Sequence, residues 1–236
     1  MRIGLIADLH GNMTAVSRLE QDIHRRNLDK LWCLGDIVGK GPSSDRTFDW
    51  AAANCDVILR GNWDEGVGNR HFCNDFFYHE QLGEKRLKRL QEFPLEKHLV
   101  LSGKHIRLLH GRPVTKSIPF IHDEAASLAP LFQPDCQVVG YADCHRQGLR
   151  TLDCGLLFNT GSVGNSLGVT HIQYAILEGD EEDITAPLDF TFVNLPYDNQ
   201  AAVEEVRQQP GLRYPDAFIE EITKGTYSRH LNNKEK

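Results

Sequence analysis

The chain lacks the features that would place it in a membrane. No apolar run approaches the roughly 20 residues that a helix needs to cross a bilayer. The first residues read directly as an apolar strand, without the longer apolar region of a secretory signal. We therefore expect a cytoplasmic protein that makes no contact with a membrane.

The chain also has little of what nucleic-acid binding requires. It carries 26 Lys and Arg against 33 Asp and Glu, for a net charge of −7. Affinity for a phosphate backbone rests on clustered basic side chains, so we expect no extended nucleic-acid surface. One glycine-containing stretch surrounds Lys40 in "VGKGP", but it lacks the G-x-x-x-x-G-K-[ST] spacing of a P-loop. That motif is therefore excluded.

Cysteines are few and scattered. The sequence has six, none of them in a Cys-x-x-Cys pair, and several lie inside apolar strand patterns. This distribution predicts buried free thiols in a reducing compartment rather than a disulfide framework.

The length of 236 residues, with 40% hydrophobic and 25% charged residues, predicts one domain over 1–236. In the first quarter, apolar strand patterns alternate with helical spacing. We expect strands at 2–7, 28–36 and 56–62, and helices at 12–26 and 45–55. This alternation indicates βαβ units around a largely parallel sheet.

The rest of the chain divides into three parts. Residues 63–97 are polar with helical spacing, and Pro94 ends this pattern, so we expect a helical lid over the site there. Five β-like runs follow, at 104–111, 136–143, 155–162, 171–180 and 188–195. The tail predicts two closing helices within 198–225, and no internal repeat or linker is visible.

Polar side chains follow several of these strands. Asp8 and His10 come after the first, Asp36 after the second, Asn62 after the third and His110 after the run at 104–111. Strand ends that meet at one edge of a sheet bring such residues together. Oxygen and nitrogen ligands gathered in this way are typical of a two-metal hydrolytic site.

These residues carry a resemblance to a known family. In their order and spacing, "DLHGN", "GDIVGKGP", "RGNWDE", "LLHGRP" and "NTGSVGN" resemble the motifs of the calcineurin-like metallophosphoesterase superfamily, and of a bacterial branch of small stand-alone members. The resemblance covers nearly the whole chain. It implies an α/β fold, a four-layer αββα sandwich of two β-sheets flanked by helices, with a supporting turn at "NTGSVGN".

The resemblance also implies the roles of the ligands. Asp36 matches the carboxylate that bridges two divalent ions, which in the family hold a bridging hydroxide. Asp8 and His10 would serve the first metal, while Asn62 and His110 would serve the second.

The last family motif, G-H-x-H, departs from its usual form, because the sequence reads "GYADCH". One register places Tyr141 and Asp143 at the two histidine positions. The other, which we prefer, places Asp143 and His145 there and so retains two metal-competent side chains. By resemblance, Asp143 would serve the second metal and His145 the first.

A carboxylate at Asp143 in place of an imidazole adds a hard oxygen donor and a negative charge. Both favour Mn or Fe for the two divalent ions, with Mg or Zn also compatible. The additional anion should leave the pKa of a bridging water higher than in an all-histidine site, which predicts an alkaline activity optimum.

Trp63 is a second departure, because many family members have a histidine there that protonates the leaving oxygen. An indole cannot supply that proton, so good leaving groups such as nucleotide or aryl groups are favoured. Trp63 either packs against the lid or stacks on such a leaving group. His71 and His79 on the expected lid are the other candidates for the acid that protonates the leaving oxygen. Asn12 and Arg112 adjoin ligand positions and, with Asp36, are the candidate catalytic residues. Of Asn12 and Arg112, Arg112 is the better suited to bind a phosphate oxygen.

The sequence therefore predicts a metal-dependent phosphoester hydrolase, foremost a phosphodiesterase acting on a small nucleotide-like phosphoester. A phosphomonoesterase or a protein serine/threonine phosphatase is the alternative within the same chemistry. A weakly active regulatory protein that binds metal or nucleotide is the alternative of another class.

Overall fold

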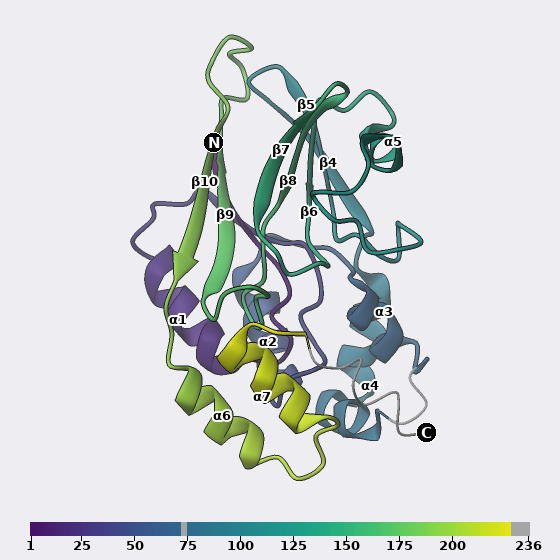
Figure 1. The fold of residues 1–236 in the computed structure, drawn as a ribbon, viewed down its shortest axis with the longest axis vertical. Coiled ribbons are helices and arrows are strands. Elements are labelled where there is room, and N and C mark those ends of the chain that lie inside the picture. Colours follow the sequence, from purple (N-terminus) through teal and green to yellow (C-terminus); the bar gives the residue numbers. More distant parts are fainter. Residues whose placement is uncertain (72–74, 228–236) are drawn as a thin grey trace.

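The computed structural model describes residues 1–71 and 75–227, which form two five-stranded sheets flanked by helices (Figure 1). The first sheet has the order β10-β9-β1-β2-β3 and the second the order β4-β5-β6-β8-β7. The strands of the first sheet are β1 Arg2–Ile6, β2 Lys30–Cys33, β3 Val57–Ile58, β9 Ile172–Glu178 and β10 Asp189–Leu195. Those of the second are β4 Glu96–Leu101, β5 Lys104–Leu109, β6 Val138–Tyr141, β7 Gly148–Leu152 and β8 Gly155–Asn159.

The parallel βαβ arrangement expected for the first three strands is confirmed, but it does not extend to the whole sheet, because both sheets are mixed. β1–β2–β3 and β5–β6–β8 pair in parallel. β9 and β10 form an antiparallel hairpin that adds to β1, and β4 and β7 close the second sheet as antiparallel edges. The sequence pattern identified the hairpin strands but not their direction, because alternation of apolar residues is the same in both arrangements.

The two sheets pack face to face over an apolar core. Successive side chains of a strand point to opposite faces, so Ile3 and Leu5 of β1 enter this core while Ile6 faces the helices. From the second sheet the core receives Ile106, Leu108, Val138 and Phe158, among others. Residues of both sheets therefore share this core.

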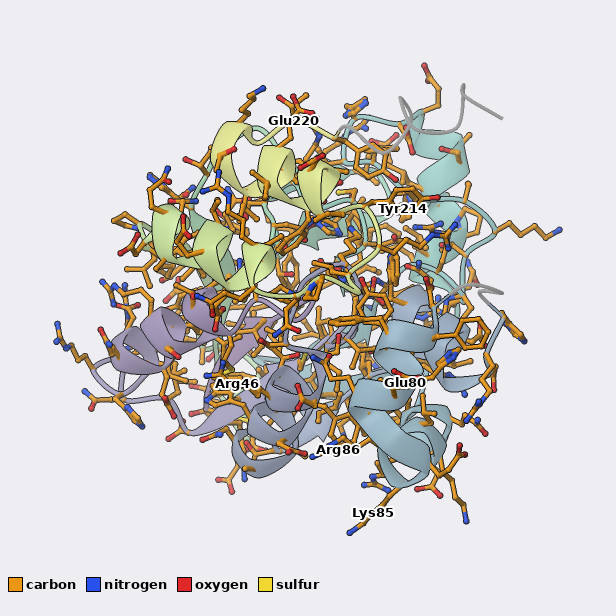
Figure 2. The ribbon with its side chains drawn as sticks, turned by 90° about the horizontal axis from the view of Figure 1, so that it is seen from below. Arg46, Glu80, Lys85, Arg86, Tyr214 and Glu220 are labelled. Carbon is orange, nitrogen blue, oxygen red and sulfur yellow. The ribbon has the colours of Figure 1, made fainter. Side chains whose placement is uncertain are left out.

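Most helices cover the other face of the first sheet. They are α1 Met13–Ile23, α2 Ser44–Asn54, α3 Asn62–Gly68, α4 Phe76–Glu92, α6 Asn199–Arg207 and α7 Pro215–Lys224. Seen from below, α1, α2, α4, α6 and α7 lie side by side (Figure 2). Arg86 of α4 makes a two-point ion pair with Asp49 of α2, and Arg46 of α2 pairs with Glu205 of α6.

A thinner layer covers the outer face of the second sheet. It consists of α5 Ala125–Leu128, a short 3₁₀ turn Ala129–Phe132 and the loop before them. Leu128, Leu131 and Phe132 pack there against Val139 and Leu157 of the sheet. Helices, sheet, sheet and helices together make the four-layer sandwich that the resemblance implied.

The segment 63–97 packs on the core through α3 and α4. Val67, Leu82, Leu87 and Leu90 are buried in the cluster beneath the helical layer. Of this segment, Trp63 borders the cavity described below. A lid formed by the whole segment stays a prediction.

The five described cysteines are free: Cys33, Cys136 and Cys144 are buried, Cys55 is half-buried and Cys154 is exposed. The expectation of buried thiols is therefore wrong for Cys154, which lies in the turn between β7 and β8, and Cys73 lies outside the described residues. Among the described residues, no helix combines the length and apolar character required to span a membrane.

Candidate metal centre

The carboxyl ends of four strands meet and bring the predicted polar residues together. Asp8 and His10 follow β1, Asp36 follows β2, and His110 follows β5. His145 arrives from the loop after β6. Two groups of side chains have ligand atoms within 4.8 Å of one another: Asp8, His10 and His145, and Asp8, Asp36 and His110.

The backbone at these positions is unusual. Asp8, His10, Asp36, Asp143 and His145 all have positive φ, between 44° and 65°. A side chain in this left-handed region costs about 1–2 kcal/mol relative to the right-handed one. Such strain is retained where surrounding contacts enforce it, and it concentrates at functional sites.

Three histidines have the same orientation, which fixes their protonation pattern. Each ring places Nδ1 against a backbone carbonyl: His10 against Val38 at 3.1 Å, His110 against Leu34 at 2.8 Å, and His145 against Asn165 at 2.9 Å. A carbonyl only accepts, so each Nδ1 carries the proton and each Nε2 of a neutral ring presents a lone pair. Metal-binding histidines are commonly held in this way.

The Nε2 atoms of these rings converge. His10 Nε2 and His145 Nε2 are 3.3 Å apart, and Lys40 Nζ lies 3.2 Å from the same His145 nitrogen. His110 Nε2 has no hydrogen-bond partner within the described part of the chain. A metal ion could take the lone pairs of these nitrogen atoms in place of their present partners.

The fully buried Asp8 carboxylate lies close to all three of these nitrogen atoms. Its Oδ1 lies 3.7 Å from His10 Nε2, 3.7 Å from His110 Nε2 and 3.5 Å from His145 Nε2. Neither carboxylate oxygen has a hydrogen-bond partner among residues 1–71 and 75–227. Burial raises the pKa of Asp8 well above its usual value. A buried ionised carboxylate requires a compensating charge, and a divalent metal supplies one.

Asp36 belongs to the second group and also approaches His10 of the first, while Asp8 belongs to both. Its Oδ2 is 3.5 Å from His10 Nε2 and 3.3 Å from His110 Nε2, while its Oδ1 accepts a hydrogen bond from the Trp63 amide at 2.8 Å. Burial would lower the pKa of His110, but the nearby Asp36 and Asp8 carboxylates outweigh it and raise that pKa to about 10. Without metal, His110 Nε2 therefore carries a proton, and metal binding must displace that proton.

Asp64 was not predicted to act here, yet it fixes the Asp36 loop. Its carboxylate accepts hydrogen bonds from the amides of Asp36 at 2.7 Å, Ile37 at 3.0 Å and Gly61 at 3.0 Å. Burial raises the pKa of Asp64 to about 7, while the amide hydrogen bonds oppose that rise. The acidic residue two positions after Asn62 thus joins the strand ends that carry Asp36 and Asn62.

Asn62, Arg112 and Asp143 form the polar rim of the site. Arg112 donates to both oxygens of Asp143, through Nε at 2.9 Å and a terminal nitrogen at 2.6 Å, and its amide adds a third bond at 3.0 Å. The same terminal nitrogen lies 3.4 Å from Asn62 Oδ1. Burial alone would raise the pKa of Asp143, but the ion pair with Arg112 outweighs burial and lowers that pKa. Asp143 Oδ1 accepts one hydrogen bond, which leaves it a lone pair for a metal.

The structure separates the two registers of "GYADCH" in space. Asp143 and His145 border the cavity with Asp36, whereas Tyr141 is buried in the cluster on the outer face of the second sheet. The "NTGSVGN" segment supports the neighbouring loops: Ser162 donates to the Asp8 carbonyl at 3.0 Å and Asn159 to the Ala142 carbonyl at 2.7 Å.

Asn12 is fully engaged in structural contacts. Its Oδ1 accepts from the Ala15 amide at 3.1 Å and caps α1, and its Nδ2 donates to the Gly164 carbonyl at 2.7 Å and to the Tyr197 hydroxyl at 3.2 Å. It does not border the cavity. These contacts support a role in anchoring the loop that carries Asp8 and His10, and a substrate contact by Asn12 stays a prediction.

A cavity of about 170 Å³ opens over the centre. Its lining combines charged and polar residues with apolar ones: Asp36, Lys40, Asn62, Trp63, Arg112, Ile118, Asp143, Cys144, His145, Leu167 and Tyr227. The Trp63 ring meets the His10 ring edge to face, with centroids 5.9 Å apart. Neither His71 nor His79 belongs to this lining. Lys40 does, and sequence reasoning missed it because it considered the lysine only as part of a P-loop.

Comparison with known proteins agrees with this geometry. Residues 1–182 match the model of the calcineurin-like phosphoesterase superfamily domain. The chain is 25% identical over 228 residues, covering 86% of it and 91% of the relative, to the uncharacterised protein MJ0912 of Methanocaldococcus jannaschii. The chain belongs to the calcineurin-like metallophosphoesterases.

Solved structures show the same fold. A metallophosphoesterase from Sphaerobacter thermophilus superposes with a TM-score of 0.76 at 22% identity, and the hypothetical protein PH1004 from Pyrococcus horikoshii with 0.78 at 17% identity. Each comparison covers 96% of this chain and 99% of the other. The similarity therefore extends over both sheets and the closing helices.

Proposed function

We propose that this chain hydrolyses phosphoesters with two divalent metal ions, and that it acts as a phosphodiesterase on small nucleotide-like substrates. One observation carries the proposal. Three histidine Nε2 atoms converge on the buried carboxylate of Asp8, whose two oxygens have no hydrogen-bond partner among the described residues. Two metal ions held by these residues would supply positive charge for the attacking and leaving oxygens and would lower the pKa of a coordinated water.

The donor set assigns the residues that would hold each ion. Asp8, His10 and His145 would hold one ion, and Asp36 and His110, which lie together with Asp8, would hold the other. We assign Asn62 to the second ion as the family resemblance implies. We assign the bridging role to Asp36, because its Oδ2 lies 3.5 Å from His10 Nε2 and 3.3 Å from His110 Nε2. Asp143 adds the open lone pair of its Oδ1 to the second group. This mixture of oxygen and imidazole donors suits Mn or Fe, with Mg or Zn also accepted.

The rim residues orient the substrate. Asp143 holds the Arg112 guanidinium by two points, which presents its plane at the cavity for a phosphoryl oxygen. Trp63 forms an apolar wall and contributes no acidic proton. We therefore expect an ester with a leaving group that departs without protonation, which fits aryl and nucleotide esters. The small cavity suits such substrates better than a folded protein segment.

The test is hydrolysis by purified protein, stripped of metal and reloaded with manganese. We expect turnover of bis(p-nitrophenyl) phosphate that exceeds turnover of p-nitrophenyl phosphate. Faster hydrolysis of the monoester would replace the phosphodiesterase assignment by the phosphomonoesterase alternative. Manganese uptake without hydrolysis of either ester would support the regulatory alternative.

A further inference from the structure

The segment 165–167 holds His145 at two points. The Asn165 carbonyl accepts a hydrogen bond from His145 Nδ1 at 2.9 Å, and the Leu167 amide donates to the His145 carbonyl at 2.9 Å. The first contact orients the ring so that its Nε2 faces Asp8, whose Oδ1 lies 3.5 Å away. The position of Asn165 therefore determines where this ligand presents its nitrogen.

The side chain of Asn165 is anchored to helix α7. Its Nδ2 donates to Oε2 of Glu221 at 2.7 Å. Both side chains are buried, since Asn165 is 2% exposed and Glu221 is 0% exposed. A hydrogen bond between buried groups is costly to break, because water cannot take the place of the missing partner.

Helix α7 makes a second contact with the same part of the chain. The carbonyl of Gly225, at the end of α7, accepts a hydrogen bond from the Gly168 amide at 2.8 Å. The Gly225 amide in turn donates to the Glu221 carbonyl at 2.9 Å, so both contacts come from one turn of the helix. Phe218 of this helix is buried in the core. The segment that holds His145 is therefore attached to a packed helix on both sides.

Two other ligands are held by different parts of the chain. His110 donates from its Nδ1 to the carbonyl of Leu34, which follows β2, and His10 donates to the carbonyl of Val38. A change at Glu221 should therefore affect the ring of His145 and leave the ring of His110 in place.

We propose that Glu221 is a positioning residue of the metal centre, which acts through Asn165 to hold the His145 ring with its Nε2 directed at a metal ion. This inference rests on the proposed function. It gives α7 a role in the site, although α7 lies beyond the residues 1–182 that match the family model. Partners that orient a metal-binding histidine contribute about 10- to 100-fold to metal affinity.

Two measurements test the proposal. The first follows the Nδ1 protons of His145 and His110 by NMR in metal-free protein, because a hydrogen bond to a buried carbonyl slows the exchange of such a proton with water. Glu221→Ala should speed this exchange for His145 and leave it unchanged for His110. The second is a manganese titration, in which Glu221→Ala should weaken the binding of one ion about 10-fold.

Three further variants serve as comparisons. Glu221→Gln should behave as wild type in both measurements, because its amide oxygen can accept the same hydrogen bond. Glu220→Ala is the matched control, since Glu220 lies at the outer edge of the molecule and pairs with Lys224 (Figure 2). Ile222→Val loosens the packing of α7 but leaves the hydrogen bond of Asn165 intact. Neither Glu220→Ala nor Ile222→Val should change either measurement.

Unchanged exchange of the His145 proton in Glu221→Ala would overturn the assignment, even if the wild type binds two manganese ions. Losses in Glu221→Gln or Ile222→Val equal to those in Glu221→Ala would overturn it as well, because the hydrogen bond would then not be their cause. If Glu221→Ala does not fold, Asn165→Ala breaks the same hydrogen bond and is judged by the same measurements. A wild-type protein that binds no manganese would remove the proposed function itself, and the NMR measurement would still decide whether Glu221 holds the ring.

Discussion

Replacing Asp64 by alanine tests how the centre is held together. The Asp64 carboxylate is buried and accepts three backbone amides, from Asp36, Ile37 and Gly61. Alanine leaves these three donors without an acceptor. Each buried donor left unsatisfied costs roughly 1–2 kcal/mol, so we expect Asp64→Ala to lower the free energy of unfolding by about 3–6 kcal/mol.

The partial replacement Asp64→Asn gives a graded result. Its amide oxygen can keep the two bonds that Asp64 Oδ2 accepts, while its NH₂ group meets the Ile37 amide, which is also a donor. The loss should then be about 1–3 kcal/mol.

Urea denaturation followed by tryptophan fluorescence measures both variants, with Asp153→Ala as the control. Asp153 is an exposed aspartate in the turn between β7 and β8, and its replacement should change stability by less than about 0.5 kcal/mol. An Asp64→Ala protein that loses less than about 1 kcal/mol would refute the reasoning, because the three amides would then not depend on this carboxylate.

Three further predictions concern the metal ions and their ligands. Asp143→Ala should lower the manganese content of the purified protein, whereas Tyr141→Phe should leave it unchanged; the reverse order would restore the rejected register. Asp143→His should raise activity with zinc or cobalt relative to manganese, because imidazole suits the later ions, and an unchanged metal ranking at equal occupancy would place Asp143 outside the coordination sphere. Manganese at 100 times its dissociation constant should stabilise the stripped protein by about 2.7 kcal/mol, seen as a rise in Tm that EDTA reverses; no rise would mean that the folded state binds no manganese.

Much of the fold was accessible from the sequence because its signals are local. The strand before Asp8 and the helix after it follow from apolar spacing, and the motifs at Asp36 and His110 lie at strand ends as predicted. The direction of β9 and the edge strands β4 and β7 were not accessible. Their positions depend on pairing with distant strands, which apolar alternation does not encode.

The candidate site likewise has features that the sequence predicts and others that it does not. The sequence pattern indicated which side chains would come together as ligands, but the contacts that hold those ligands in place come from other parts of the chain. The Asp64 hydrogen bonds, the Arg112 pair with Asp143 and the position of Lys40 each require loops to meet that are separated in sequence. Such contacts follow from the tertiary structure, and a motif of a few residues does not contain them.

Manganese stoichiometry by equilibrium dialysis tests the central claim most directly. The account predicts two ions per wild-type chain, and a loss of at least one in Asp36→Asn, where the carboxylate assigned the bridging role becomes a neutral amide. A wild-type chain that binds only one ion or none, or an Asp36→Asn chain that binds as many as wild type with the same affinity, would contradict it.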